Sequence, residues 1–296
     1  MTSATQCSLT APAKLNLFLH VTGRRADGYH ELQTLFQLLD YGDEVRLACR
    51  EDGRIKRASG IEELAAEDDL SVKAARLLKA ESGTGKGCDI SVEKRIPVGG
   101  GLGGGSSDAA AVLLGLNGLW KLGMDEDSLA GLGLRLGADV PVFVRGCSAW
   151  GEGVGERLTP VSLESAWYLV VIPGCAVSTG KVFASPALTR QTAPQTIDRF
   201  SRRKSGEGAP AISLSALWEA TQNDCEPVVR AMYRQVDAAL CWLSGFAEAR
   251  MTGTGAAVFA PFPDRAEAGR VLERLPGELN GFVARGVDRV SRRIDT

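Results

Sequence analysis

The stretch Gly99-Gly-Gly-Leu-Gly-Gly-Gly-Ser-Ser-Asp108 has six glycines in its first seven positions. Before it, apolar residues alternate with other types over residues 90–96 and predict a strand that ends at Pro97. After it, residues 109–120 are rich in Ala and Leu and predict a helix. A strand, a turn without side chains and a helix start favour anion binding, because backbone N–H groups can approach phosphate oxygens at the positive end of the helix dipole. We therefore expect a nucleoside triphosphate site.

The glycine stretch does not fit three common nucleotide-binding motifs. A Walker loop needs Gly-Lys followed by Ser or Thr, and no such triplet follows these glycines. A protein kinase also needs a His-Arg-Asp and an Asp-Phe-Gly triplet, which the chain lacks. A Rossmann fingerprint needs an acidic residue about 20 positions on, after a second strand, but residues 121–127 predict a polar turn. A flexible linker fits poorly, because ordered elements adjoin the glycines on both sides. Within the stretch, Ser106 or Ser107 is expected either to cap the helix or to donate its hydroxyl to an oxygen or a metal.

The composition limits the class of protein. With 296 residues and 44% hydrophobic content, the chain suffices for one large domain or two ordinary ones. Its net charge of −2 gives no overall field that favours nucleic acid or an anionic membrane. Seven scattered cysteines and only two histidines argue against a zinc site and are typical of a reducing compartment. We see no export signal and no apolar run of membrane-spanning length, so we expect a cytoplasmic protein.

The chain is expected to divide near residue 160, where the composition changes. Before that point, the patterns predict strands over 13–21 and 43–49 and helices over 69–81, 109–120 and 125–135. After a strand over 167–172, the polar stretch 191–210 predicts a long mobile loop. The rest predicts a helix over 227–243, strands over 246–251 and 255–261, a helix over 264–275 and a strand over 281–286. This β-α-β-β-α-β order is a split βαβ arrangement. We therefore predict an α+β protein with two domains, over 1–160 and 161–296.

A few residues could carry the chemistry of phosphoryl transfer, which needs positioning, charge neutralisation and a group that takes the acceptor proton. Lys14 lies on an otherwise apolar predicted strand, where it either serves function or extends its ammonium to solvent. Asp139 is a lone carboxylate among apolar residues, where it either caps a turn or meets a cation, which Lys14 could supply. Such a pair near the acceptor hydroxyl would orient and deprotonate it. Tyr29 and His30 end a polar loop, and they either pack in an ordinary way or stack on a base or sugar.

Four motifs resemble those of the GHMP small-molecule kinases, in the same order and at similar spacing. They are Pro12-Ala-Lys-Leu-Asn-Leu17, residues 99–107, Gly137-Ala-Asp-Val-Pro-Val-Phe143 and Thr252-Gly-Thr-Gly255. Two further segments, Arg25-Ala-Asp-Gly-Tyr-His30 and Gly153-Val-Gly-Glu156, resemble the branch of that family whose acceptor is a cytidine diphosphate-linked methylerythritol. The resemblance extends over nearly the whole chain. It implies an S5-like N-terminal domain and a ferredoxin-like C-terminal domain, and the latter agrees with the predicted element order.

The resemblance also implies an activity and a set of site residues. The activity is ATP-dependent phosphorylation of the 2-hydroxyl of the methylerythritol unit, in the non-mevalonate route to isoprenoids, with Asp139 as the base and Lys14 steadying the hydroxyl. The residues that would bind ATP are Lys94, near the adenine, and the loop Pro97, Val98, Gly99, Gly100, Gly101, Leu102, Gly103, Gly104, Gly105, Ser106 and Ser107. The residues that would bind the acceptor are Tyr29 and His30, on the cytosine, and Asn16, Val154 and Phe183 elsewhere in the pocket.

The expected cofactors are ATP, as a substrate, and Mg²⁺. Asp108 stands at the helix start, where its charge would repel a triphosphate unless a cation offsets it, so one hypothesis is that Asp108 helps to hold Mg²⁺. The expected partner is the small-molecule substrate, without nucleic acid or membrane, and the expected state is a monomer or a weak homodimer. Two other functions stay open. One is a GHMP kinase for another small alcohol, of homoserine or mevalonate type, against which the Tyr29-His30 pair argues. The other is a non-catalytic sensor of ATP and a metabolite, against which Lys14 and Asp139 argue.

Overall fold

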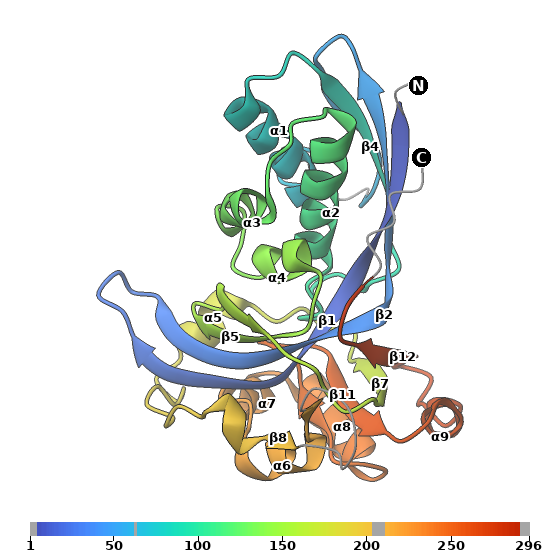
Figure 1. Cartoon of the computed structure of the whole chain (residues 1–296). Helices are drawn as coiled ribbons and strands as arrows, with labels where there is room; N and C mark the ends of the chain where they lie inside the picture. Colours follow the sequence, from blue (N-terminus) through green and yellow to red (C-terminus); the bar gives the residue numbers. More distant parts are fainter. Residues whose placement is uncertain (1–4, 62–63, 203–210, 291–296) are drawn as a thin grey trace.

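The fold is organised around two long antiparallel strands, β1 (Gln6–Arg24) and β2 (His30–Arg50), which run across most of the molecule (Figure 1). The computed structural model describes residues 5–61, 64–202 and 211–290. In this part of the chain, ten strands form one sheet, while β8 (Ser201–Arg202) and β9 (Ala211–Ile212) form a small second one. Because β2 pairs with strands of both halves of the chain, the two halves share one sheet.

The N-terminal half places helices on one face of its part of the sheet. The C-terminal end of β2 pairs with β4 (Gly87–Glu93), and β3 (Ile55–Ser59) lies parallel to β4. The N-terminal end of β2 pairs with β5 (Ala149–Gly153), which in turn pairs with β6 (Arg157–Pro160). The helices are α1 (Leu70–Ser82), α2 (Gly104–Leu119), α3 (Glu126–Leu134) and α4 (Val140–Arg145), which lie together in Figure 1. Most residues of α2 are buried, and its small Ala side chains let the neighbouring elements approach closely.

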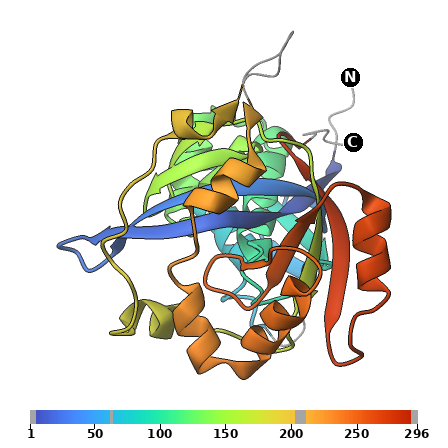
Figure 2. The same ribbon diagram turned by 90° about the horizontal axis from the view of Figure 1, so that it is seen from below.

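The C-terminal half has the predicted β-α-β-β-α-β order. Its elements are β7 (Trp167–Ile172), α7 (Glu226–Met232), α8 (Arg234–Ser244), β10 (Arg250–Met251), β11 (Val258–Phe262), α9 (Arg265–Leu272) and β12 (Asn280–Val287). The strands lie in the order β10-β11-β7-β12 with antiparallel neighbours, which is the ferredoxin-like arrangement. Seen from below, this half lies in front of the N-terminal helices (Figure 2). The expected two-domain α+β fold is therefore confirmed.

The C-terminal half differs from the sequence predictions in local detail, and β10 covers only the last two residues of the strand expected over 246–251. The single helix expected over 227–243 is two helices, because Tyr233 is extended (ψ 94°) and its hydroxyl accepts a hydrogen bond from the backbone of Ser178. The expected mobile loop is anchored over its first part: Thr192 N donates to Val21 O at 3.1 Å, and Phe200 is buried. A 3-10 helix (Ile197–Arg199) lies in the same stretch. Residues 203–210 of that loop lie outside the described residues.

Two further helices complete the described C-terminal half. They are α5 (Thr179–Ala184), which follows β7, and α6 (Leu214–Ala220), which precedes α7. Within the described ranges, no helix has the length and apolar character that crossing a lipid bilayer would require.

Candidate active site

The glycine stretch forms a loop over residues 99–103, and its last two glycines, Gly104 and Gly105, belong to helix α2. Gly103 is the N-cap of α2 and has a left-handed conformation (φ 76°), and Ser107 N donates the first intrahelical hydrogen bond to Gly103 O at 2.9 Å. The helix thus begins at Gly104, five residues before the predicted start, and the expectation that Ser106 or Ser107 caps it is wrong. The N–H groups of the first turn precede that first hydrogen bond, so they remain available to an anion.

At two positions of the loop, Gly101 and Gly103, both the left-handed backbone conformation and close neighbouring atoms require glycine. A Cβ on Gly101 (φ 74°) would lie 2.7 Å from Thr252 O, in the turn of the fourth sequence motif. A Cβ on Gly103 would lie 2.7 Å from Cζ of Phe143 on α4. Such separations are well inside van der Waals contact, so side chains are excluded at both positions. The loop is therefore enclosed between the C-terminal half and α4.

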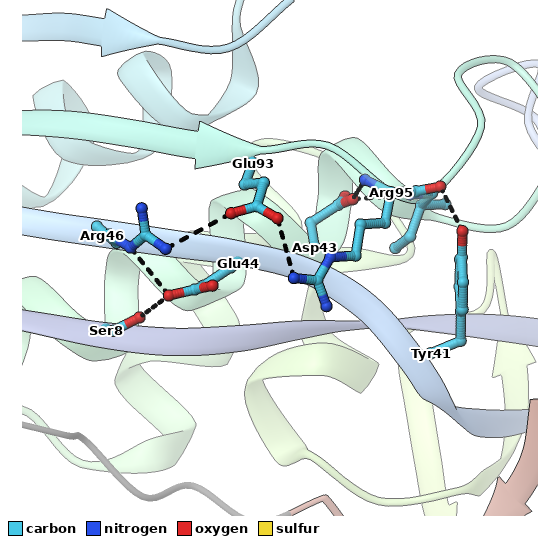
Figure 3. A network of polar contacts seen from close by, with 8 residues as sticks. Ser8, Tyr41, Asp43, Glu44, Arg46, Glu93 and Arg95 are labelled. Carbon is cyan, nitrogen blue, oxygen red and sulfur yellow. Dashed lines mark hydrogen bonds and ion pairs between the residues drawn. The ribbon is translucent and has the colours of Figure 1, made fainter.

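The start of the loop is fastened to β2 by polar contacts on the sheet (Figure 3). The carboxylate of Asp43 accepts hydrogen bonds from Arg95 N (2.5 Å) and Ile96 N (2.8 Å), while the Tyr41 hydroxyl donates to Arg95 O at 2.7 Å. The Arg95 guanidinium also reaches Glu93 at 2.9 Å. Residues of β2 thus satisfy two backbone N–H groups and one carbonyl group of residues 95–96. These contacts set the direction in which the loop leaves the sheet.

Lys94 connects this segment to α2. Its ammonium contacts the carboxylate of Asp43 and lies 2.7 Å from Asp108 Oδ2. The pKa of Asp108 is raised to about 7, chiefly by burial, while Lys94 opposes the rise and Asp43 adds to it. Burial lowers the pKa of Lys94, but the two carboxylates outweigh this effect and the pKa is raised overall. The ion pair therefore joins β2, the start of the loop and the N-terminal part of α2.

A small cavity of about 270 Å³ lies against the loop. Of the predicted ATP-binding residues, it is lined by Lys94, Pro97, Val98, Gly99, Gly100, Gly101, Leu102, Gly103, Gly104 and Gly105. Asp108 lines it as well. Ser106 instead lines a second, larger cavity. Ser107 lines neither cavity, because its side chain is buried beneath the helix start.

Lys14 is turned toward the loop by an irregular stretch of β1. The register of β1 against β2 shifts on both sides of this residue, which re-aims side chains out of the normal alternation. Lys14 N donates to Leu102 O at 3.0 Å. Its ammonium donates to Asn16 Oδ1 (2.5 Å) and Gly101 O (3.0 Å) and lies 3.2 Å from Asp139 Oδ2. Each of its three N–H bonds thus has an acceptor, so the buried charge is compensated.

Asp139 occupies the N-cap position of α4, but its side chain makes no capping hydrogen bond. The carboxylate faces Lys14 instead and remains 35% exposed. The contact expected between these two residues is therefore present, and the alternative of a capping side chain is not realised. The structure leaves Asp139 open to a ligand in the larger cavity, which it lines.

The larger cavity has a volume of about 1180 Å³ and brings together residues far apart in the sequence. Those predicted from the sequence are Lys14, Asn16, Tyr29, His30, Gly99, Gly101, Gly103, Gly104, Gly105, Ser106, Asp139, Val154 and Phe183. The ring of His30 stacks on Phe183 with centroids 5.0 Å apart, whereas Tyr29 is 67% exposed at the rim. Asn16 is almost fully buried and donates to Thr34 Oγ1 while it accepts from Lys14. Its observed contacts therefore orient Lys14.

Sequence reasoning missed three residues that support this site. Asp43 fastens the loop, Asn223 donates to Met251 O and Gly253 O beneath it, and Arg190 donates to His30 Nε2 at 3.1 Å. Asp43 was detectable in principle, because a carboxylate between strand residues is seldom buried without donors. The other two act across 28 or more positions of the chain, which no local pattern reports.

Comparison with known proteins identifies the family of the chain. Residues 69–147 match the family model of the GHMP kinases N terminal domain, and residues 209–281 match that of the GHMP kinases C terminal domain. The 4-diphosphocytidyl-2-C-methyl-D-erythritol kinase of Halorhodospira halophila is 57% identical, over 94% of this chain and 92% of that protein.

Two solved structures show the same fold. A crystal structure of 4-(cytidine 5'-diphospho)-2C-methyl-D-erythritol kinase superposes with a TM-score of 0.77 at 32% identity, over 94% of this chain and 98% of the other. Homoserine kinase from Cytophaga hutchinsonii has a TM-score of 0.69 at 15% identity, over 98% of this chain and 96% of the other, which is a likeness of fold alone. On these matches, which extend over almost its whole length, the chain belongs to the GHMP kinase family.

Proposed function

We propose that this chain transfers a phosphoryl group from ATP to the 2-hydroxyl of 4-diphosphocytidyl-2-C-methyl-D-erythritol, a step of the methylerythritol phosphate route to isoprenoids. The observation that carries the proposal is the larger cavity, where the Lys14–Asp139 pair and the glycine loop meet Tyr29 and His30. A donor loop, a proton acceptor and an aromatic surface for a base thus share one space. The Halorhodospira halophila relative is named as a kinase for this acceptor, which supports the same substrate.

The proposed mechanism assigns a role to each group of the cavity. The Asp139 carboxylate takes the proton of the acceptor hydroxyl, and general base catalysis of this kind is worth about 10²–10⁴-fold in rate. Lys14 is held by Asn16 and Gly101, so its charge stays beside the carboxylate and the oxygen that attacks. The N–H groups at the start of α2 bind the phosphate oxygens of ATP. Most of the rate enhancement then comes from positioning and charge, as phosphoryl transfer requires.

We propose that Mg²⁺ is part of the donor substrate and arrives bound to the phosphates of ATP. Within residues 5–61, 64–202 and 211–290, no group of three or more His, Cys, Asp or Glu side chains could hold a metal ion. The Asp108 side chain is 6% exposed and faces Lys94. We therefore assign the neutralisation of Asp108 to Lys94 rather than to Mg²⁺, so Asp108→Asn should leave the Mg²⁺ dependence of turnover unchanged.

A coupled assay of ATP consumption by the purified protein tests the function. We expect turnover with the cytidyl acceptor and none above background with homoserine or mevalonate, because neither carries a base that could contact Tyr29 and His30. Turnover with one of those alcohols alone would refute the proposed acceptor but keep the kinase reaction. Folded protein that binds ATP and the cytidyl compound without turnover would instead indicate a sensor.

We propose that residues 1–160 and 161–296 are the two domains, and the two family models fall on either side of that boundary. We also propose that the protein acts in the cytoplasm on a small molecule, as a monomer or a weak homodimer. Size-exclusion chromatography with light scattering measures this last point directly.

A further inference from the structure

Arg190 joins two walls of the larger cavity through one guanidinium group. Its Nε donates to His30 Nε2 at 3.1 Å, at the start of β2. Its Nη2 donates to Phe183 O (2.9 Å) and Ser185 O (2.7 Å), at the end of α5. Its Nη1 donates to Leu188 O at 3.1 Å. Because the rings of His30 and Phe183 stack on each other, Arg190 fixes both partners of that stack.

The bond from Arg190 also decides where His30 carries its proton. Arginine stays protonated in proteins and can only donate, so His30 Nε2 must offer a lone pair. A neutral imidazole has one protonated nitrogen, and that nitrogen is then Nδ1. An imidazolium would set an N–H against the guanidinium N–H. In agreement, burial, Arg190 and Arg24 all lower the pKa of His30.

The Nδ1 atom is the one left for a ligand. In the described part of the chain, no protein group forms a hydrogen bond with His30 Nδ1. This atom is also not one of the polar atoms that are buried without a partner. His30 lines the larger cavity together with Tyr29 and Phe183. An N–H at this position needs an acceptor. Cytosine presents acceptors at N3 and O2, whereas uracil carries a hydrogen on N3.

We propose that Arg190 is a positioning residue that fixes His30 as the tautomer protonated at Nδ1 and thereby gives the pocket a donor for the acceptor edge of cytosine. The inference rests on the proposed function for the identity of the base. It adds a reason for base selectivity: the donor is fixed before the ligand arrives, so a base that presents N–H at the same place is disfavoured.

The tautomer can be observed without any substrate. The chain has only two histidines, so ¹⁵N-histidine labelling gives two sets of ring signals, and a His30→Asn variant assigns them. We expect His30 of the wild type to be protonated at Nδ1 above its pKa, and Arg190→Gln to give a mixture of both tautomers. His20 is an internal control, because its Nε2 accepts from Gln222 N on another part of the molecule. Protonation at Nε2 in the wild type, or an unchanged tautomer in Arg190→Gln, would overturn the inference.

Kinetics separate positioning from a merely structural role. Loss of one well-placed hydrogen bond predicts about a tenfold rise in KM for the cytidyl acceptor in Arg190→Gln, with kcat and KM for ATP within about twofold. We also expect the preference for cytidine over uridine in the acceptor to fall. Arg190→Lys keeps one donor and should recover part of both effects, and it carries the same measurements if Arg190→Gln does not fold.

The matched control is Arg199→Gln, whose guanidinium contacts Gln195 on the surface of the same segment. It should change neither the tautomer nor KM. A rise in KM for ATP equal to that for the acceptor would contradict a role confined to the base. If His30 is protonated at Nδ1 but the wild type does not act on the cytidyl compound, the tautomer assignment is supported and the proposed function is refuted.

Discussion

At the residue scale, the partly exposed carboxylate of Asp139 is the group whose removal should affect chemistry more than binding. Its neighbour is the Lys14 ammonium at 3.2 Å, and the small cavity that lies against the glycine loop does not include it. We expect Asp139→Asn to lower kcat by about 10²–10⁴-fold, because the amide cannot accept the hydroxyl proton. Binding of ATP, measured by calorimetry, should stay within about threefold.

The matched control for this substitution is Asp127→Asn. Asp127 is also an aspartate near α4, 2.7 Å from Arg145, but it is 81% exposed and lies outside the cavities. Its kcat should equal that of the wild type. Near-normal kcat in Asp139→Asn would show that another group takes the proton.

Asp108 should make stability depend on pH in a defined direction. Burial raises its pKa from 3.8 to about 7, with Asp43 adding to the rise and Lys94 opposing it. Between those two values the folded protein holds a proton that the unfolded chain releases, so the stabilisation from this group is complete below about pH 4 and is lost as the pH rises through about 7. We expect the free energy of unfolding of the wild type to fall, relative to Asp108→Asn, between about pH 5 and about pH 8.

Urea denaturation of both proteins at the two pH values measures this difference. Asp127→Asn is again the control, since an exposed aspartate should leave the pH dependence of stability unchanged. A difference between the wild type and Asp108→Asn that stays constant, or that increases toward high pH, would contradict the raised pKa.

At the scale of elements, the junction of the glycine loop and α2 can be tested with two matched glycines. A Cβ on Gly103 would meet Phe143 at 2.7 Å and Lys14 Cε at 3.2 Å, whereas a Cβ on Gly123 would have no neighbour within 4 Å. Both have similar positive φ, 76° and 68°, so alanine at either costs roughly 1–2 kcal/mol in backbone strain. Only Gly103→Ala should also lower kcat/KM for ATP, by at least about tenfold, because it displaces Lys14. Steady-state kinetics and thermal denaturation of both variants decide this, and equal losses of activity would contradict it.

The elements that the sequence predicts well are those with a local signal. The strand before the glycines, the helix after them and the β-α-β-β-α-β order all follow from alternation, Ala and Leu content and turns within about ten residues. The end of that strand was placed too late, because it ends at Glu93 and not at Pro97. The start of α2 was placed too late because glycine is a poor helix former. In the folded protein, Gly104 and Gly105 are helical because the buried remainder of α2 compensates for that low propensity.

The missed parts depend on contacts between distant residues. The stretch 191–202 looks like a loop by composition, yet Gln195 N donates to Gln33 Oε1 at 2.7 Å and Phe200 is buried. Arg190, at its border, was passed over for the same reason, since its partner His30 is 160 positions away. The motifs brought the candidate site residues to attention, but the groups that hold those residues in place follow only from the tertiary structure.

At the scale of the whole molecule, the two halves are joined by more than a linker. Strand β12 of the C-terminal half pairs with β2, with Gly286 opposite Leu39. Leu19 of β1 donates to Gln222 O at 3.0 Å and accepts from Asp224 N at 2.8 Å. One buried cluster also combines residues of both halves, among them Leu15, Leu35, Tyr168 and Phe259. Separating the halves would therefore expose apolar surface and unpaired backbone groups together.

From this joint construction we expect the halves to unfold in one cooperative transition. Ordinary domains that meet through a small polar interface unfold separately, but a shared sheet and a shared core couple their stabilities. The measurement is urea denaturation followed by far-UV circular dichroism, together with pulse-labelling hydrogen exchange of peptides from before and after residue 160. Both sets of peptides should lose protection at the same urea concentration as the dichroism signal. Two separated midpoints would show that the contacts between β12 and β2, and between Leu19 and the segment 222–224, contribute too little to couple the halves. The glycine loop would then pack against a C-terminal half that can unfold independently.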